Sequence, residues 1–116
     1  IWDIAGNVWE WTDATILGKD EPRGVANPSD FDWYEYTNLV SYGTFSPERL
    51  LPLNPSWNAN QGYGRIYSSG APNNSNTYVF LRGGSWGNEA VAGVLALHLD
   101  SGTSDTDSGL GFRCAR

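Results

Sequence analysis

The chain has 116 residues, which is enough for one compact domain and too few for two. Its six tryptophans, six tyrosines and four phenylalanines argue against a disordered tail, and no apolar run approaches the roughly 20 residues that cross a bilayer, so we expect no membrane insertion. The formal net charge is −6 and only one basic residue is a lysine, so we expect no nucleic-acid partner.

We expect residues 1–116 to form a single domain, the C-terminal part of a longer protein, because the chain lacks methionine and starts abruptly at Ile1. The single cysteine, Cys114, has no partner for an internal disulfide. The single histidine, His98, gives little basis for a Ser-His-Asp triad or a multi-histidine metal site.

Two tryptophans mark the first predicted strand. Gly6-Asn7 is a turn signal, and in residues 8–12 the indoles of Trp9 and Trp11 alternate with other side chains, which predicts a short strand that buries both. Residues 13–77 are predicted to be mostly irregular. The exception is residues 46–51, where a serine N-cap, a proline and a glutamate predict a short helix.

The C-terminal third carries clearer strand signals. The apolar run at residues 78–81 predicts a strand, and the Arg-Gly-Gly sequence after it predicts a turn or bulge. Residues 94–100 alternate, which predicts a strand that buries its leucines. His98 and Asp100 should then point outward, on the same face as Val94 and Ala96.

A polar segment at residues 101–109 predicts a solvent-facing loop, so residues 98–109 should form an open ridge. Leu110, Phe112 and Cys114 alternate with small or charged residues after it, which predicts a closing strand with these three side chains on the core face. Most connections are short, which favours antiparallel pairing.

Three motifs occur in order: GNVWEW at residues 6–11, RGGSW at residues 82–86 and GFRCA at residues 111–115. In this set the chain resembles the formylglycine-generating-enzyme (sulfatase-modifying factor) superfamily. The resemblance implies an α+β, C-type-lectin-like fold that is loop-rich, with short antiparallel strands and few short helices.

The last 35 residues resemble one branch of that superfamily, the variable proteins of diversity-generating retroelements, in which adenine-directed mutagenesis recodes AAC-type codons between RGGSW and GFRCA. Such codons do not reach Lys, Gln, Met, Glu or Trp, and between Gly87 and Gly109 only Glu89 departs from this rule. The resemblance implies variable or ligand-contacting roles for ten residues: Gly87, Asn88, Glu89, Val91, His98, Asp100, Ser101, Asp105, Asp107 and Gly109.

The function that this resemblance implies is non-catalytic ligand binding. The expected partner is a protein or glycan receptor on a cell surface, and the expected location is a virion tail or a bacterial cell surface. Presentation as a homo-oligomer would let weak contacts add up. Between Arg82 and Arg113 the sequence contains acidic residues but no lysine or arginine, and this negative charge favours a basic or polar partner. Aromatic side chains could add contact area or only fix the long loop: Trp57, Tyr63, Tyr67 and Tyr78.

Two rival functions stay open: an enzyme-type domain of the same superfamily, and a plain structural domain. The oxidases of the superfamily use two cysteines after the GGS motif, and those positions fall on Asn88 and Gly93, so we expect no enzyme activity. Cys114 is expected in the core. His98 beside Asp100 could do acid–base work, but the pair has no nucleophile, and an exposed contact role is the default.

A structural calcium ion is a further expectation. Residues 3–10 contain two carboxylates and free carbonyl oxygens around a glycine turn, and these are hard donors suited to Ca²⁺. The resemblance implies Asp3, Gly6, Val8 and Glu10 as its ligands. Alternatively, Asp3 caps a turn and Glu10 pairs with an arginine.

Overall fold

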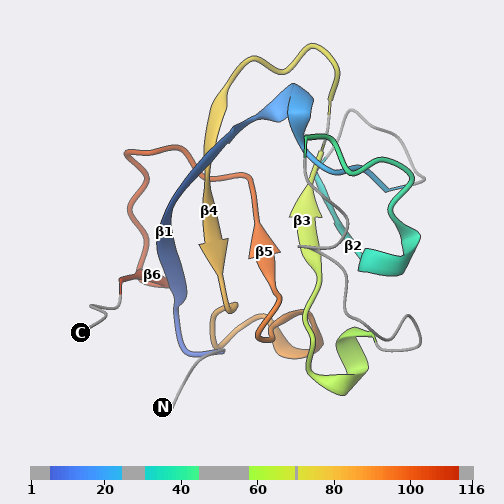
Figure 1. Ribbon diagram of the computed structural model, residues 1–116. Helices are drawn as coiled ribbons and strands as arrows, with labels where there is room; N and C mark the ends of the chain where they lie inside the picture. The colour runs from blue at the N-terminus through green and yellow to red at the C-terminus, as the bar shows by residue number, and fades with distance from the viewer. Residues whose placement is uncertain (1–5, 25–30, 45–57, 70, 113–116) are drawn as a thin grey trace.

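The computed structural model describes residues 6–24, 31–44, 58–69 and 71–112. Within these residues six strands form one sheet in the order β2-β3-β5-β4-β1-β6 (Figure 1). The strands are β1 (Trp9–Leu17), β2 (Asp32–Tyr34), β3 (Ile66–Ser68), β4 (Thr77–Arg82), β5 (Leu97–His98) and β6 (Leu110–Gly111). The helices of the described residues are single 3₁₀ turns: η1 (Gly18–Asp20), η2 (Tyr36–Asn38), η3 (Ala59–Gln61) and η4 (Glu89–Val91). This sheet-rich, loop-rich architecture is compatible with the predicted α+β class.

The sheet is mixed. β1 pairs with β4, β4 with β5 and β2 with β3 in antiparallel fashion, as predicted. β1 with β6 and β3 with β5, however, are parallel pairs, so the expectation of antiparallel strands is wrong there. A parallel pair needs a long crossover, and the chain supplies one by placing β4 between β3 and β5 in sequence.

The first strand begins where the tryptophan alternation predicts it and ends later. β1 continues to Leu17, whereas residues 13–17 were predicted to be irregular. The register shifts between Trp11 and Thr15, so a bulge interrupts the period of two before Ile16 pairs with Tyr78. Trp9 is buried and Trp11 is half-buried. The predicted helix at residues 46–51 lies outside the described residues.

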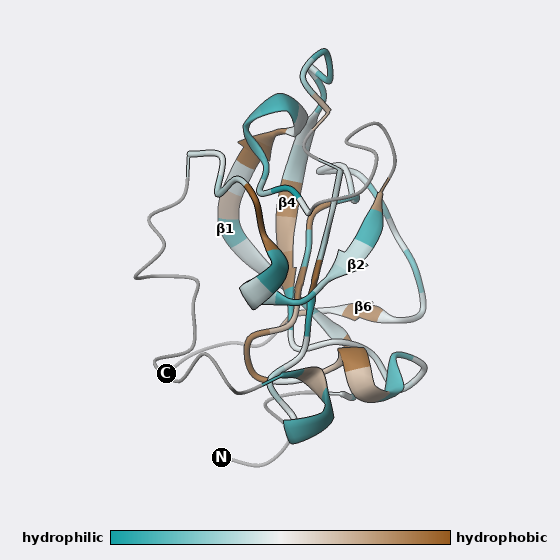
Figure 2. Cartoon of the chain, turned by 90° about the vertical axis from the view of Figure 1, so that its right-hand side faces the viewer, coloured by the Kyte–Doolittle hydropathy of each residue, from teal (hydrophilic) through white to brown (hydrophobic). Residues whose placement is uncertain are grey.

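One face of the sheet holds the larger core cluster. Tyr34, Ile66 and Leu97 lie side by side in the register of β2, β3 and β5. Figure 2 shows hydrophobic residues along β4, and Tyr78 of this strand is buried in the cluster. The buried members of the cluster are Ile16, Tyr34, Tyr36, Leu39, Ile66, Tyr78, Leu97 and Leu99.

The opposite face carries a row of aromatic residues. Trp33, Tyr67 and His98 are register partners across β2, β3 and β5, and Leu81 and Trp11 continue the same row on β4 and β1. Because strand residues two apart share a face, Trp9 lies on this side as well. A second cluster forms here from Trp9, Val79, Leu81 and Ala96.

The predicted strands of the C-terminal third are present in part. β4 covers the apolar run, and Gly83 and Gly84 then take φ of +90° and +83°, so the predicted turn is confirmed. Leu97 and Leu99 are buried as predicted. Ala96, just before β5, was predicted to face outward but is fully buried, because it packs in the second cluster with Trp9, Val79 and Leu81.

The closing strand is shorter than predicted. β6 ends at Gly111 at the edge of the sheet, and Phe112 is 79% exposed, so its predicted core position is wrong. The cause is that pairing with β1 stops at Gly111, which leaves Phe112 beyond the sheet. Cys114 lies outside the described residues. None of the helices in the described ranges has the length and apolarity that a membrane span requires.

Candidate functional site

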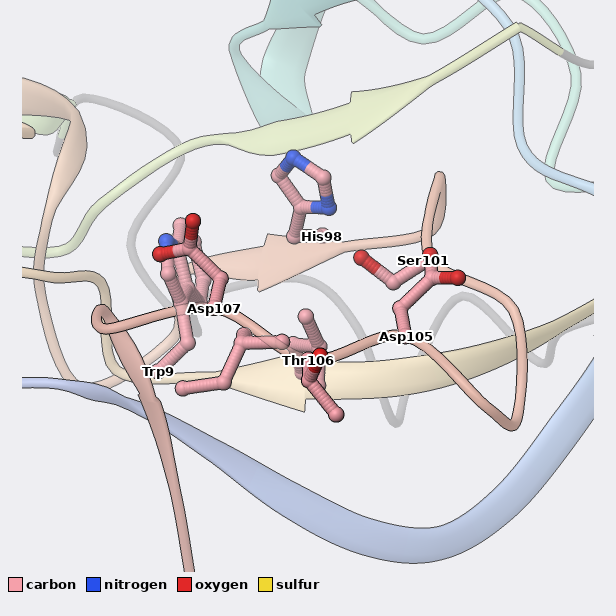
Figure 3. A pocket seen from close by; sticks show the side chains of 8 residues that line it. Trp9, His98, Ser101, Asp105, Thr106 and Asp107 are labelled. Carbon is pink, nitrogen blue, oxygen red and sulfur yellow. The ribbon is translucent and has the colours of Figure 1, made fainter.

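A pocket of about 370 Å³ opens on the aromatic face of the sheet (Figure 3). Its floor comes from four neighbouring strands, and its rim comes from the loop that follows β5. Four of its residues belong to the ten that the resemblance implied as ligand contacts. The lining residues are Trp9, Leu81, His98, Ser101, Asp105, Thr106, Asp107 and Leu110.

His98 lies inside an aromatic cluster. Its ring stacks on Tyr67 with centroids 4.6 Å apart and planes at 21°, and it meets Trp9 at 5.2 Å and Trp33 at 6.0 Å. His98 lies on the face opposite the buried leucines, as predicted, but the rings of three other strands leave it half-buried instead of exposed. Burial lowers the pKa of His98 from 6.5 to about 4, so the imidazole is neutral at pH 7. Its Nδ1 is buried and has no hydrogen-bond partner among the described residues.

The rim loop is attached to the sheet at both ends. The Val79 N–H donates to the carbonyl of Ser101 at 2.9 Å, and the Trp9 N–H donates to the carbonyl of Gly109 at 2.7 Å. Between these anchors residues 103–108 are exposed, which agrees with the predicted solvent-facing loop. Gly109 itself is buried. The backbone of the rim is therefore fixed, while most of its side chains face the solvent.

Two rim aspartates shape the loop through their own side chains. Asp105 Oδ2 accepts a hydrogen bond from the Gly102 N–H at 2.8 Å, and Asp107 Oδ1 accepts one from the Gly109 N–H at 2.6 Å. Figure 3 shows Asp105 beside Ser101 on this loop, in front of β4 and β5. Each carboxylate thus holds the loop with one oxygen, and no hydrogen bond from the described residues reaches its other oxygen.

The rim is surrounded by negatively charged carboxylates. Burial and the neighbouring Asp105 raise the pKa of the Asp100 carboxyl. Burial, and then Asp100 and Asp32, raise the pKa of the Tyr67 phenol. Among the described residues no lysine or arginine side chain lines the pocket. Arg82 belongs to the opposite face, since it alternates with Leu81 along β4 and acts on the phenol of buried Tyr36 there.

The other predicted contact residues do not line this pocket. Asp100 is exposed beside it. Asn88 lies between β4 and β5, and its side-chain oxygen accepts from both the N–H and the hydroxyl of Ser85, each at 2.7 Å. A Cβ atom on Gly109 would be 3.6 Å from Ser85 Cβ, so this second segment adjoins the rim at Gly109. Its candidate residues, half-buried or exposed, are Gly87, Asn88, Glu89 and Val91.

Sequence reasoning missed half of the pocket. Trp9, Leu81 and Leu110 were predicted as core, and Thr106 was predicted only as part of the loop. The period-two pattern of each strand placed apolar side chains on one face but gave no register between strands that are distant in sequence. The alternation of Asp105 and Asp107 around Thr106 was the signal available for the rim.

The calcium prediction is not tested by these residues. Asp3, one of its two carboxylates, lies outside the described part of the chain. Gly6 has φ +91°, and its N–H is directed at the carbonyls of Gly83 and Gly84 at 3.1 and 3.2 Å. Within the described ranges no group of three or more His, Cys, Asp or Glu side chains forms a metal-binding cluster.

Comparison with known proteins places the chain in a family. No curated protein and no solved structure matches it significantly. The family model of the sulfatase-modifying factor enzyme 1-like domain (FGE-sulfatase) matches residues 1–116. The three motifs at residues 6–11, 82–86 and 111–115 resemble this superfamily, and the match extends over all three. The chain therefore belongs to the sulfatase-modifying factor enzyme 1-like domain family.

Proposed function

We propose that this domain is a non-catalytic ligand-binding module with a C-type-lectin-like fold, and that its C-terminal surface is of the kind diversified in retroelement variable proteins. The partner is a protein or glycan receptor on a cell surface, met from a virion tail or a bacterial surface. The observation that carries the proposal is the pocket, because its rim belongs to one loop whose backbone the sheet holds at both ends.

The division between floor and rim supports recognition by changeable side chains. Leu81 and Trp9 are 1% and 7% exposed, so substitutions there would disturb packing. Ser101 is half-buried and Asp105 and Asp107 are exposed, so substitutions there should disturb the packing of the core little. A ligand can therefore be selected at the rim without a change of fold.

The proposal does not include oxidase chemistry. The resemblance, matched from the GGS motif, implies that the two cysteine positions of the oxidases correspond to Asn88 and Gly93, and neither is a cysteine here. The Asn88 side chain is engaged with Ser85, and glycine carries no side chain that could act as a nucleophile.

A display library tests the proposal. The library randomises the two adenines of AAC codons at eight of the ten predicted contact positions: Gly87, Asn88, Glu89, Val91, Asp100, Ser101, Asp105 and Asp107. We expect most members to fold, and members selected on different immobilised proteins, glycans and bacterial cells to differ in sequence. A matched library at Ile66, Leu81 and Leu97, which are 0–1% exposed, should yield mostly unfolded protein. If no folded member of the first library binds any target, the binding function is wrong.

The encoding DNA gives a second test. We expect a near-identical template repeat that differs mainly at adenines, together with a reverse-transcriptase gene. If both are missing from the source genome, the diversified part of the proposal fails, and a binding domain with a constant surface takes its place.

A further inference from the structure

The pocket is lined by both hydrogen-bond acceptors and aromatic rings. The rings of Trp9 and His98 lie 5.2 Å apart at its floor. On its rim, Asp105 and Asp107 each use one oxygen to hold the loop. No donor from the described residues contacts the second oxygen of either carboxylate. The site therefore offers negative charge and π-electron density that no group of the described chain neutralises.

The charge around the pocket disfavours an anionic ligand. Asp100 and Asp105 are close enough to repel each other, which contributes to the raised pKa of Asp100. Arg65, a cation on the neighbouring β3 side, is already paired with Glu35 at 2.7 Å. The His98 imidazole adds no positive charge at pH 7, because burial holds its pKa near 4.

We propose that the pocket binds the guanidinium group of an arginine side chain on a protein partner. This inference rests on the proposed function, since it names the ligand class of the same surface. A guanidinium group is planar, donates hydrogen bonds only, pairs with carboxylates and packs against aromatic rings. These properties match the free oxygens of Asp105 and Asp107 and the rings of Trp9 and His98.

The size and polarity of the pocket favour a single side chain over a sugar chain. Its volume of about 370 Å³ is near the lower end of the roughly 300–1,000 Å³ of ligand cavities, which suits one inserted group. Sugar hydroxyls both donate and accept hydrogen bonds. The rim offers mainly acceptors, and its only lining hydroxyls are those of Ser101 and Thr106 among the described residues.

The test uses three short capped peptides, Gly-Arg-Gly, Gly-Lys-Gly and Gly-citrulline-Gly, titrated into the ¹⁵N-labelled protein at pH 7. Citrulline has the shape of arginine without its charge. We expect the arginine peptide to shift the Trp9 indole N–H and the amides of residues 101–109. Its Kd should be at least about fivefold lower than that of the citrulline peptide, and should rise with salt.

Variants locate the effect on the rim. Asp105→Asn with Asp107→Asn removes two charges but keeps an oxygen that can accept the Gly102 and Gly109 N–H groups, so the loop should keep its shape. This double variant should bind the arginine peptide at least about fivefold more weakly. Asp13→Asn with Asp20→Asn removes the same charge from two residues that do not line the pocket and should change the Kd by less than about twofold.

Each outcome has a distinct meaning. Equal shifts by the arginine and citrulline peptides, or equal binding to both double variants, would overturn the arginine inference. If a panel of monosaccharides shifts the same amides and the peptides do not, the pocket is a sugar site, so the inference fails while the proposed binding function stands. If neither the peptides, the sugars nor any library selection involves this surface, both fail.

Discussion

The neutral, covered state of His98 makes a quantitative prediction about acid stability. The folded pKa is about 4 and the unfolded value is 6.5, so between these pH values the unfolded chain binds a proton that the folded chain does not. The stabilisation from the neutral imidazole is therefore fully present above pH 6.5 and decreases as the pH falls from 6.5 toward 4. A difference of this size corresponds to about 3 kcal/mol lost over that interval.

Two measurements check this. His98 is the only histidine of the chain, so its imidazole Cε1–H proton gives an unambiguous NMR titration, with an expected midpoint near pH 4. Urea unfolding at pH 7 and pH 4.5 should show a loss of stability in the native sequence. In His98→Phe, which keeps an aromatic ring against Tyr67 and Trp9 but cannot be protonated, this histidine-dependent part of the loss should vanish.

A titration midpoint near 6.5 would refute the reasoning, because it would show that the cluster of Trp9, Trp33 and Tyr67 does not desolvate the imidazole enough to lower its pKa. If His98→Phe loses as much unfolding free energy between pH 7 and pH 4.5 as the native protein does, carboxyl groups rather than His98 determine the pH dependence of stability. Asp100 acts in the opposite direction, since a raised carboxyl pKa favours the folded state at low pH, and it is present in both proteins.

Three further predictions concern the stability of the fold. Gly64→Ala should lower the free energy of unfolding by more than about 2 kcal/mol, because φ is +83° and a Cβ would lie 2.7 Å from that of Ala96. Gly62→Ala, where φ is +80° but nothing lies within 4 Å of a Cβ, should lower it by only about 1 kcal/mol. Equal losses for the two variants in urea unfolding would contradict this. Tyr36→Phe removes the hydroxyl that donates to the Leu95 carbonyl and should cost about 1 kcal/mol in the same assay, while no change would show that the bond is unimportant. EDTA should lower the melting temperature by several degrees if calcium binds near the N-terminus, and an unchanged melting temperature would overturn the calcium prediction.

Local pattern was sufficient where one strand alone determines the outcome. The apolar run of β4, the turn at Gly83-Gly84 and the burial of Leu97 and Leu99 all depend on neighbours in sequence. The start of β1 at Trp9 was predicted for the same reason. Its end was not, because the bulge after Trp11 breaks the alternation, and pairing with Thr77–Val79 of β4 then continues the strand.

The position of His98 could not be predicted in this way. Alternation assigns Leu97 and His98 to opposite faces but does not say what covers each face. On the second face of β5, the His98 ring meets Tyr67 of β3 and Trp9 of β1, which leaves it half-buried. That information is contained in the order of the strands, which depends on contacts between residues far apart in the chain.

The hydrogen bonds that the rim aspartates make to their own loop limit which residues this surface can carry. Asp107 holds the Gly109 N–H, and Gly109 in turn accepts from the Trp9 N–H, so this rim position is coupled to the pocket floor through two hydrogen bonds. Asn, Asp and Ser all offer a short side-chain oxygen to a nearby N–H, whereas apolar residues do not. If position 107 varies as the proposed function requires, residues with such an oxygen should predominate among folded variants. Ser101, which contributes to these bonds only through its backbone carbonyl, should accept a wider range of side chains.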